Sequence, residues 1–533
     1  MARSLNSEKT SPDHLTLKIN APGMTAMHRA GLGGLAATLA RLTICRNNGE
    51  RPCTGSEPLW HEEYDWSVSP IEVSLQFGKP EWAGDFMEWL FKYAFQIRDK
   101  MIFLPGQYGN TPPPPEVRAR LQEGIMLTFL QHVTSKSLGP EVVGSYEYDK
   151  HNIGYKYSSC ISYATHQSAW VNWINKETRG LIPKNYKVSA KLNPGVVVRH
   201  YAFKIQTTVS PPLELVFPLA FAIVGTLALP INPINYETGV LIVPYIDDLT
   251  TFAKLRSKLT PTSIKDTNIG GIGDAVLQYE IRCKGSESME VYSLPGCDAI
   301  RFQRKPWSHG QKVRTNILSI TSIIDSKFYA AALKYFPPDL RKSQNAKNTD
   351  AAEENQYRWR IGIIRPFIAD NLVRGKSWFA GFSKLMKDSD TVSKILSERK
   401  RLNKMVTDEQ LDWKMDGARS LVIAVHQALR CRYGQISSES IPGSAKNRME
   451  KEYDRWRIAF ARSKTQEQFR YSLCDLFSRA KTGSELKQHW EHIIRLLQND
   501  WLAARDLALI GLASYKGTSS ESPEDDTTSS DEN

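Results

Sequence analysis

The 533-residue sequence lacks the short motifs that identify the common enzyme classes. It has no Walker A loop, no G-x-S-x-G elbow and no H-E-x-x-H zinc helix. The glycines of residues 268–273 (NIGGIG) are in the wrong register for a dinucleotide fingerprint. We therefore expect no catalysis, no cofactor and no metal. The alternative is a metal-dependent nuclease whose site is assembled from separate parts of residues 145–300.

Paired acidic and histidine residues are also sparse. Asp247 and Asp248 are adjacent, so on a strand they would point to opposite faces, and we expect them to cap a helix. His489 and His492 share a helix face, but no third ligand stands at a useful spacing. We expect both histidines to face solvent.

The cysteines do not indicate a disulfide framework, because their number, seven, is odd and no two of them have C-x-x-C spacing. The pattern fits reduced thiols in a cytosol. Met1–Asp13 is polar and does not resemble a signal peptide. The longest apolar run, Leu213–Pro230, contains Glu214 and Pro218, so we expect a buried helix or helix–strand pair rather than a membrane span.

Basic residues are in excess, with 69 Lys and Arg against 57 Asp and Glu and a net charge of +12. The last seventeen residues, Gly517–Asn533, carry six acids and no base. Residues 1–516 therefore carry +18, since all 69 basic residues stand there against 51 acidic ones. Such a basic body predicts a polyanionic partner, most often nucleic acid, although a merely soluble basic surface has the same composition.

The hydrophobic pattern predicts an α+β protein with a mixed α/β body followed by an all-α bundle. We expect a strand at 14–19, a buried strand ending at Pro244 with an Asp-started helix after it, and helix from residue 356 onward. The predicted domains are the body at 1–336, a linker at 337–355, the bundle at 356–516 and a disordered acidic tail at 517–533. Other expected elements are a helix at 81–104, strands at 184–210, a polar loop at 263–275 and strands at 276–305.

Two segments have unusual compositions. The helix expected at 24–39 contains Gly31, Gly33 and Gly34, which indicates that another backbone comes close to it. Residues 145–160 interleave four tyrosines with lysine, histidine and asparagine. This pattern is typical of a surface that stacks on bases, and equally of a β-hairpin with one wet face.

The segment LTLKINAPGMTAMHRAGLGGLAATL (15–39) resembles the N-terminal signature of the large subunit of type I CRISPR effector complexes (Cascade), nearest to the I-A/I-B group and its Myxan-type branch. GVLIVPYIDDLTTFAKLR (239–256) is similar to that family's strand–proline–helix segment. The resemblance implies a non-catalytic subunit that recognises a protospacer-adjacent motif (PAM) on duplex DNA, helps to open the duplex and stabilises the R-loop. It also implies a role in antiviral defence or in RNA-guided transposition.

The resemblance also implies the partners, namely guide RNA, double-stranded target DNA, the displaced strand, the other Cascade subunits, and a recruited helicase-nuclease or transposition proteins. An RNA-binding scaffold without DNA contact is a further alternative. The candidate PAM-reading residues lie in three polar loops: Lys265, Asn268, Gly270 and Gly271; Asn152, Gly154 and Lys156; and Asn110. Arg455, Arg462 and Arg470 are candidates for the displaced strand, and His28 and Arg29 for the guide-RNA handle or a partner subunit.

Overall fold

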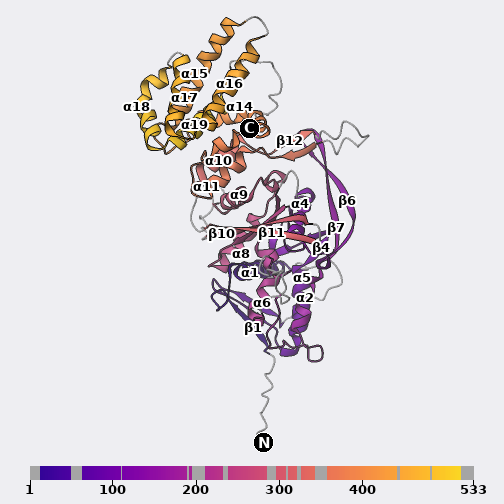
Figure 1. Ribbon diagram of the computed structural model, residues 1–533. Helices are drawn as coiled ribbons and strands as arrows, with labels where there is room; N and C mark the ends of the chain where they lie inside the picture. Colours follow the sequence, from indigo (N-terminus) through magenta and orange to yellow (C-terminus); the bar gives the residue numbers. More distant parts are fainter. Residues whose placement is uncertain are drawn as a thin grey trace. The chain divides into compact units, whose positions relative to one another are not determined.

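The computed structural model describes residues 12–49, 63–109, 111–188, 191–194, 210–231, 238–284, 296–307, 310–320, 326–342, 357–440, 444–480 and 483–517. The chain divides into two compact units (Figure 1). The first unit comprises residues 1–326 and 338–361, and the helical unit comprises residues 327–337 and 362–533.

Five small antiparallel sheets lie in the described part of the first unit. One sheet has the strand order β1-β3-β2 and another the order β11-β10-β9-β8, while β4-β5, β6-β7 and β12-β13 form separate two-stranded sheets. The strands are β1 (His14–Lys18), β2 (Asp65–Val68), β3 (Glu72–Gln76), β4 (Gln96–Arg98), β5 (Met101–Phe103), β6 (Ser137–Tyr148), β7 (His151–Ser162), β8 (Leu227–Ile231), β9 (Thr238–Pro244), β10 (Cys297–Trp307), β11 (Gly310–Ile320), β12 (Asp339–Lys342) and β13 (Tyr357–Arg360).

Helices cover these sheets and meet in an apolar core. They are α1 (Ala26–Asn47), α2 (Ala83–Ala94), α3 (Pro105–Tyr108), α4 (Pro115–Leu127), α5 (Ala164–Gln167), α6 (Leu213–Ala220), α7 (Ala222–Gly225), α8 (Leu249–Leu255) and α9 (Ile272–Lys284). The apolar run at 213–230 is thus two short helices followed by a strand, buried except for Glu214 and Leu215 in the first turn of α6, in line with the predicted buried helix or helix–strand pair. Within the described ranges no helix combines the length and apolarity that a membrane crossing requires.

The glycines of α1 allow its backbone to touch α6 and α7 directly. A Cβ on Gly31 would lie 2.0 Å from the carbonyl oxygen of Pro218, and one on Gly34 would lie 2.4 Å from that of Phe221. From the other side, a Cβ on Gly225 would lie 1.7 Å from the carbonyl oxygen of Ala30. Only glycine fits at these positions, so the predicted close approach is confirmed.

The strand–proline–helix segment is also confirmed. All seven residues of β9 are buried, and the strand ends at Pro244. Asp248 then caps α8, because its carboxylate accepts a hydrogen bond from the Thr251 amide at 2.9 Å. Helix α8 packs on α1, where Phe252 lies against Gly33.

The described part of the helical unit is all α-helix from residue 418 to 514. The helices of the unit are α10 (Ser326–Tyr335), α11 (Ile364–Leu372), α12 (Phe382–Leu385), α13 (Ser389–Ser397), α14 (Arg399–Thr407), α15 (Ala418–Glu439), α16 (Ala445–Arg462), α17 (Gln466–Arg479), α18 (Ser484–Asn499) and α19 (Trp501–Ser514). Helix α19 is the buried centre of the unit, and α15 packs along it. The buried Asp506 carboxylate accepts the amides of Gly381 and Ser383 at the start of α12 (2.6 and 2.9 Å).

Three expected elements are wrong. The helix expected from residue 356 onward begins only at Ile364, because residues 357–360 form strand β13, which pairs with β12. The helix expected at 81–104 ends at Ala94, because Asp99 and Lys100 adopt positive φ (54° and 61°) and join β4 to β5 in a tight hairpin turn. The strand expected at 276–283 is helix α9, which begins within the expected loop. Its buried residues Val276, Tyr279 and Cys283 recur at helical spacing.

Several expectations fall outside the described residues. These are Asn110, most of the strands expected at 184–210, the strand expected at 289–294, the greater part of the linker and nearly all of the acidic tail. Residues 339–342, at the start of the expected linker, form strand β12. The predicted domain boundaries stay predictions.

We predict that Gly225→Ala and Gly31→Ala each lower the free energy of unfolding by about 3 kcal/mol, because the new methyl group meets backbone atoms that cannot rotate away. Denaturant unfolding monitored by circular dichroism measures this decrease. Gly434→Ala in α15 is the matched control, since nothing lies within 4 Å of its Cβ position. It should be neutral or stabilising by up to about 1 kcal/mol. Equal effects in all three variants would contradict the close packing of the two backbones.

His166 generates a second prediction, because it is fully buried among Phe95, Phe129 and Tyr163 and neither ring nitrogen has a hydrogen-bond partner in the described ranges. Burial lowers the pKa of His166 to about 3. Below pH 6.5 the unfolded chain binds a proton that the folded chain does not, so stability falls as the pH drops.

Between pH 7 and pH 5, His166 should lower the free energy of unfolding of the wild-type chain by about 2 kcal/mol. We expect this part of the decrease to be absent in His166→Phe. Melting temperatures at the two pH values measure this decrease. His489→Gln, which removes a half-exposed histidine outside this cluster, is the control for the loss of a histidine. A wild-type pH dependence in His166→Phe would show that His166 does not contribute.

Candidate nucleic-acid interface

The tyrosine-rich segment forms the long β6–β7 hairpin of the first unit (Figure 1). Asp149 and Lys150 join the strands with positive φ (49° and 61°), which suits a two-residue turn. Side chains alternate between the two faces of the hairpin. By register, one face carries Val142, Gly144, Tyr146, Tyr148, His151, Ile153, Tyr155 and Tyr157, and the other carries Val143, Ser145, Glu147, Asn152, Gly154 and Lys156.

The hairpin has one wet face, as one of the two interpretations of this segment requires. On β6 the residues of the second face are exposed and those of the tyrosine face are half-buried. Gly144 leaves room for the Tyr155 ring, since a Cβ at position 144 would lie 2.6 Å from that ring. The Tyr155 and Tyr157 rings are nearly parallel, with centroids 6.3 Å apart and an angle of 13° between their planes.

Strand β13 holds the tip of the hairpin. The indole Nε1 of Trp359 donates a hydrogen bond to the Tyr146 hydroxyl (2.7 Å), and its ring meets Tyr148 edge to face at 4.9 Å. Tyr357 stacks on His151 at 4.5 Å. We call these residues, together with Lys265, the tip cluster.

Lys265 brings a second predicted loop to this tip. Its ammonium lies 4.7 Å from the centre of the Tyr148 ring and 5.9 Å from that of Trp359, so both π faces attract it. The loops at 150–156 and 265–271, which the sequence treats as separate candidates, therefore belong to one surface.

The other residues of the 265–271 loop turn inward. Asn268 is only 3% exposed, and its Nδ2 donates to the carbonyl oxygen of Ile264 at 2.8 Å. The Gly270 amide donates to the buried Asp274 carboxylate at 2.7 Å. The carbonyl of Gly271 accepts from Ala275 in the first turn of α9. These contacts hold the loop in place and leave Lys265 half-exposed.

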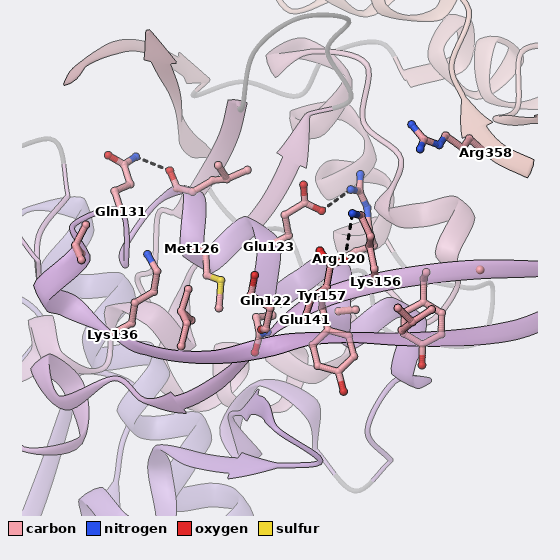
Figure 2. A pocket seen from close by; sticks show the side chains of 18 of the residues that line it. Arg120, Gln122, Glu123, Met126, Gln131, Lys136, Glu141, Lys156, Tyr157 and Arg358 are labelled. Atoms are coloured by element: carbon pink, nitrogen blue, oxygen red, sulfur yellow. Dashed lines mark hydrogen bonds and ion pairs between the residues drawn. The ribbon is translucent and has the colours of Figure 1, made fainter. Parts of the chain in front are cut away.

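A groove lies between helix α4 and the hairpin, and we call it the α4–hairpin groove (Figure 2). Its volume is about 1190 Å³. The buried Gln122 fixes its floor, because its amide donates to the Ser158 carbonyl (2.7 Å) and accepts from the Ile102 amide (2.8 Å). The groove is lined by residues of α4, the following loop, both hairpin strands and β13: Ala119, Arg120, Gln122, Glu123, Met126, Leu127, Gln131, Val133, Lys136, Leu138, Glu141, Val143, Gly154, Tyr155, Lys156, Tyr157, Ser158, Tyr357 and Arg358.

Four basic and two acidic side chains line this groove. Lys156 pairs with Glu141 at 3.2 Å and Arg120 with Glu123, and Figure 2 shows both pairs. The Lys156–Glu141 pair is largely exposed and therefore weak, so a phosphate can replace the carboxylate at little cost. Arg358 is exposed and has no acidic partner within the described ranges. With the two tyrosine rings, the groove offers cations for phosphates and aromatic faces for bases.

His28 and Arg29 lie at the start of α1. The Thr25 amide donates to Nδ1 of His28 at 3.2 Å, and the Thr25 hydroxyl lies 2.7 Å from the same nitrogen. Burial lowers the pKa of His28 to about 4, so the ring is neutral at pH 7. His28 is therefore an uncharged cap in the free chain. Its contact with a guide-RNA handle, and that of the half-buried Arg29, stay predictions.

The three predicted arginines of the helical unit differ in their surroundings. Arg455 donates to Asp475 at 3.0 Å, and its guanidinium lies over the Trp456 ring at 4.9 Å. Arg462 and Arg470 are exposed. Their role in binding the displaced strand stays a prediction.

The expected capping role of Asp248 is confirmed, since its two carboxylate oxygens accept from the hydroxyls of Thr250 and Thr251 as well as from an amide. The Asp274 carboxylate accepts a hydrogen bond from the Gly270 amide. His489 and His492 are both half-exposed, and His492 lies 2.7 Å from Asp416. No cluster of three metal-ligating side chains occurs in the part of the chain that the structure describes.

Sequence reasoning missed Trp359, Tyr357, Arg358 and Arg120. The first three stand about 200 residues after the hairpin, in a short segment that the sequence assigns to the start of the bundle. The alternation of aromatic and basic residues in 357–360 (YRWR) was the available signal, because it is typical of a strand with one apolar face.

We predict that Trp359→Leu loosens the hairpin tip, because it removes one hydrogen bond and one aromatic contact, together worth about 1–3 kcal/mol. Amide hydrogen exchange in residues 146–153 should become about ten- to hundredfold faster. Trp490→Leu, which changes a half-exposed tryptophan of α18, is the control and should leave this segment unchanged. Unchanged exchange in Trp359→Leu would refute the anchor.

Comparison with known proteins identifies the family. Residues 16–220 match the family description DevT N-terminal domain, and residues 409–533 match DevT C-terminal domain. The chain is 31% identical over 552 aligned residues to a CRISPR-associated protein Cas8a1/Csx13 of Myxococcus xanthus, and the match covers 98% of this chain and 92% of that protein. The chain therefore belongs to the Cas8a1/Csx13 family, the Myxan-type large subunits of type I CRISPR systems.

Proposed function

We propose that this large subunit recognises a PAM on duplex DNA with the hairpin tip, helps to open the duplex beside it and stabilises the resulting R-loop. It acts without catalysis of its own, within a complex of guide RNA and other Cascade subunits. A recruited helicase-nuclease or transposition machinery then acts on the DNA, in antiviral defence or in RNA-guided transposition.

The observation that carries this proposal is the position of Lys265 over the Tyr148 ring. It brings two candidate loops together on one surface, which can contact a groove of DNA. Lys265 and the exposed Asn152 supply a cation and an amide, and these are the groups that contact base edges. Asn268, Gly270 and Gly271 serve by fixing the loop that carries Lys265.

The α4–hairpin groove supports duplex opening. It begins beside the hairpin, contains Gly154 and Lys156 in its wall, and presents the parallel Tyr155 and Tyr157 rings. A strand separated at the tip can enter this groove, where bases stack on tyrosine and phosphates replace weakly held carboxylates. In the helical unit, Arg455, Arg462 and Arg470 are assigned to the displaced strand.

We predict that Lys265→Ala weakens binding of the reconstituted complex to a PAM-containing target about five- to hundredfold, the range expected when one base-edge hydrogen bond is removed. Binding to the same duplex without a PAM should stay nearly unchanged. Electrophoretic mobility shift at constant salt measures both affinities. Lys176→Ala, which changes an exposed lysine elsewhere in the first unit, is the matched control and should leave both affinities unchanged.

Equal decreases on the two duplexes would place Lys265 on the phosphate backbone and refute its role as a reader. In a subunit that is only an RNA-binding scaffold, the substitution would change neither affinity. Arg120→Ala with Arg358→Ala serves as the contrasting variant, because both arginines line the groove and would bind phosphates. This variant should reduce both affinities and lower the salt slope by about one unit for each phosphate that is no longer neutralised.

A further inference from the structure

We propose that the acidic C-terminal segment, residues 517–533, docks on a basic surface of the helical unit and there competes with nucleic acid. The basic surface consists of Lys400, Lys404 and Arg430. The competition rests on the proposed function, because it requires that this unit binds a nucleic-acid strand, whereas the docking itself does not.

The basic surface carries unbalanced positive charge. Lys400 and Lys404 are four residues apart on the outer face of α14, so the two ammonium groups are neighbours and repel each other. The sequence of α14 (RKRLNKMVT) contains four basic residues and no acid. Arg430 on α15 is exposed as well. None of the three has an acidic partner in the ranges that the structure describes, so the surface favours an anion.

The described chain leads the acidic segment to this surface. The Tyr515 ring packs between His426 (5.9 Å) and Tyr433 (5.6 Å) and thereby fixes the end of α19. The guanidinium of Arg399, the first residue of α14, donates to the Ala513 carbonyl at 3.2 Å. Burial raises the pKa of Tyr515, and the Arg430 guanidinium opposes this rise in part. Arg430 therefore lies close to Tyr515. The segment therefore starts between α14 and α15.

The segment has the charge and the length to cover the surface. It carries six carboxylates and no base, against three unpartnered cations. Sixteen residues beyond Gly517 span up to about 55 Å when extended, whereas the nine-residue helix α14 is about 13.5 Å long. Because the segment is tethered, its effective concentration at the surface is in the millimolar range. Even a weak local attraction therefore keeps the surface partly occupied.

A docked segment acts as an internal competitor. A nucleic-acid strand must displace it, so the apparent affinity falls by a factor of one plus the effective concentration divided by the local dissociation constant. For a local dissociation constant near 0.1–0.5 mM this factor is about three to ten. The competition weakens as salt screens the charges, since the Debye length is only about 3 Å at 1 M.

The test compares the full chain with a variant ending at Gly517 and with a full-length variant whose six acidic tail residues are replaced by their amides. Fluorescence anisotropy with a labelled mixed-sequence single-stranded DNA measures affinity at low and at high salt. Both variants should bind about three- to tenfold tighter at low salt, and the difference should vanish at high salt.

The triple variant Lys400→Ala, Lys404→Ala and Arg430→Ala separates docking from a general effect of net charge. In this background, removal of residues 518–533 should no longer change the affinity. In a control background with Lys446→Ala and Lys487→Ala, which changes exposed lysines of α16 and α18, the full effect should remain. An equal gain on truncation in both backgrounds would show long-range repulsion and overturn the proposal.

A labelled synthetic peptide of residues 517–533 tests docking without nucleic acid. It should bind the truncated chain in a salt-sensitive manner and should not bind the triple variant, and an amide-substituted peptide should bind neither chain. Peptide binding without DNA binding would support the docking and refute the displaced-strand role of the helical unit. DNA binding without peptide binding, and without a gain on truncation, would overturn the inference and leave the proposed function standing.

Discussion

The first unit depends on a contact between two stretches of bare backbone. Helix α1 lies so close to α6 and α7 that the carbonyl oxygens of Ala30, Pro218 and Phe221 occupy the places where Cβ atoms would otherwise stand. This contact also positions the β1-β3-β2 sheet and the β11-β10-β9-β8 sheet, because α1 follows β1 and α7 leads directly into β8. No adjustment of side chains can compensate for a change there, so the position of the helices is set at backbone level.

Arg256 continues this constraint toward the functional edge of the unit. It is only 1% exposed, and its guanidinium donates to the carbonyls of Val224 and Thr226 at 2.6 and 2.7 Å. Burial lowers the pKa of Arg256 to about 10, so it stays charged at neutral pH. A buried charge held by carbonyls is costly to disturb. Through Thr260, whose hydroxyl donates to the Gln107 carbonyl, the same network reaches the segment that precedes α4 and the groove.

The sequence was sufficient where local chemistry determines the structure. The glycines of α1 and the Pro244–Asp248 boundary identified both elements, and the all-helical C-terminal region followed from its periodicity. It failed where a turn or a helix start depends on residues of ordinary propensity. The positive φ of Asp99 and Lys100 ended a predicted helix, and the apolar composition of α9 suggested a strand although its spacing is helical.

The candidate site was only half predictable, for a reason that lies in its construction. The hairpin and the Lys265 loop each carry a local signal, but their meeting depends on Trp359, whose indole nitrogen finds the Tyr146 hydroxyl across 213 residues of sequence. A single tryptophan in a short strand gives no sign of such a partner. Because Trp359 holds the tip from the tyrosine face, the wet face with Asn152 and Lys156 stays open to a ligand. The same aromatic anchor thus orders the hairpin tip and leaves its wet face exposed, while Tyr155 and Tyr157 of the tyrosine face line the groove beside it.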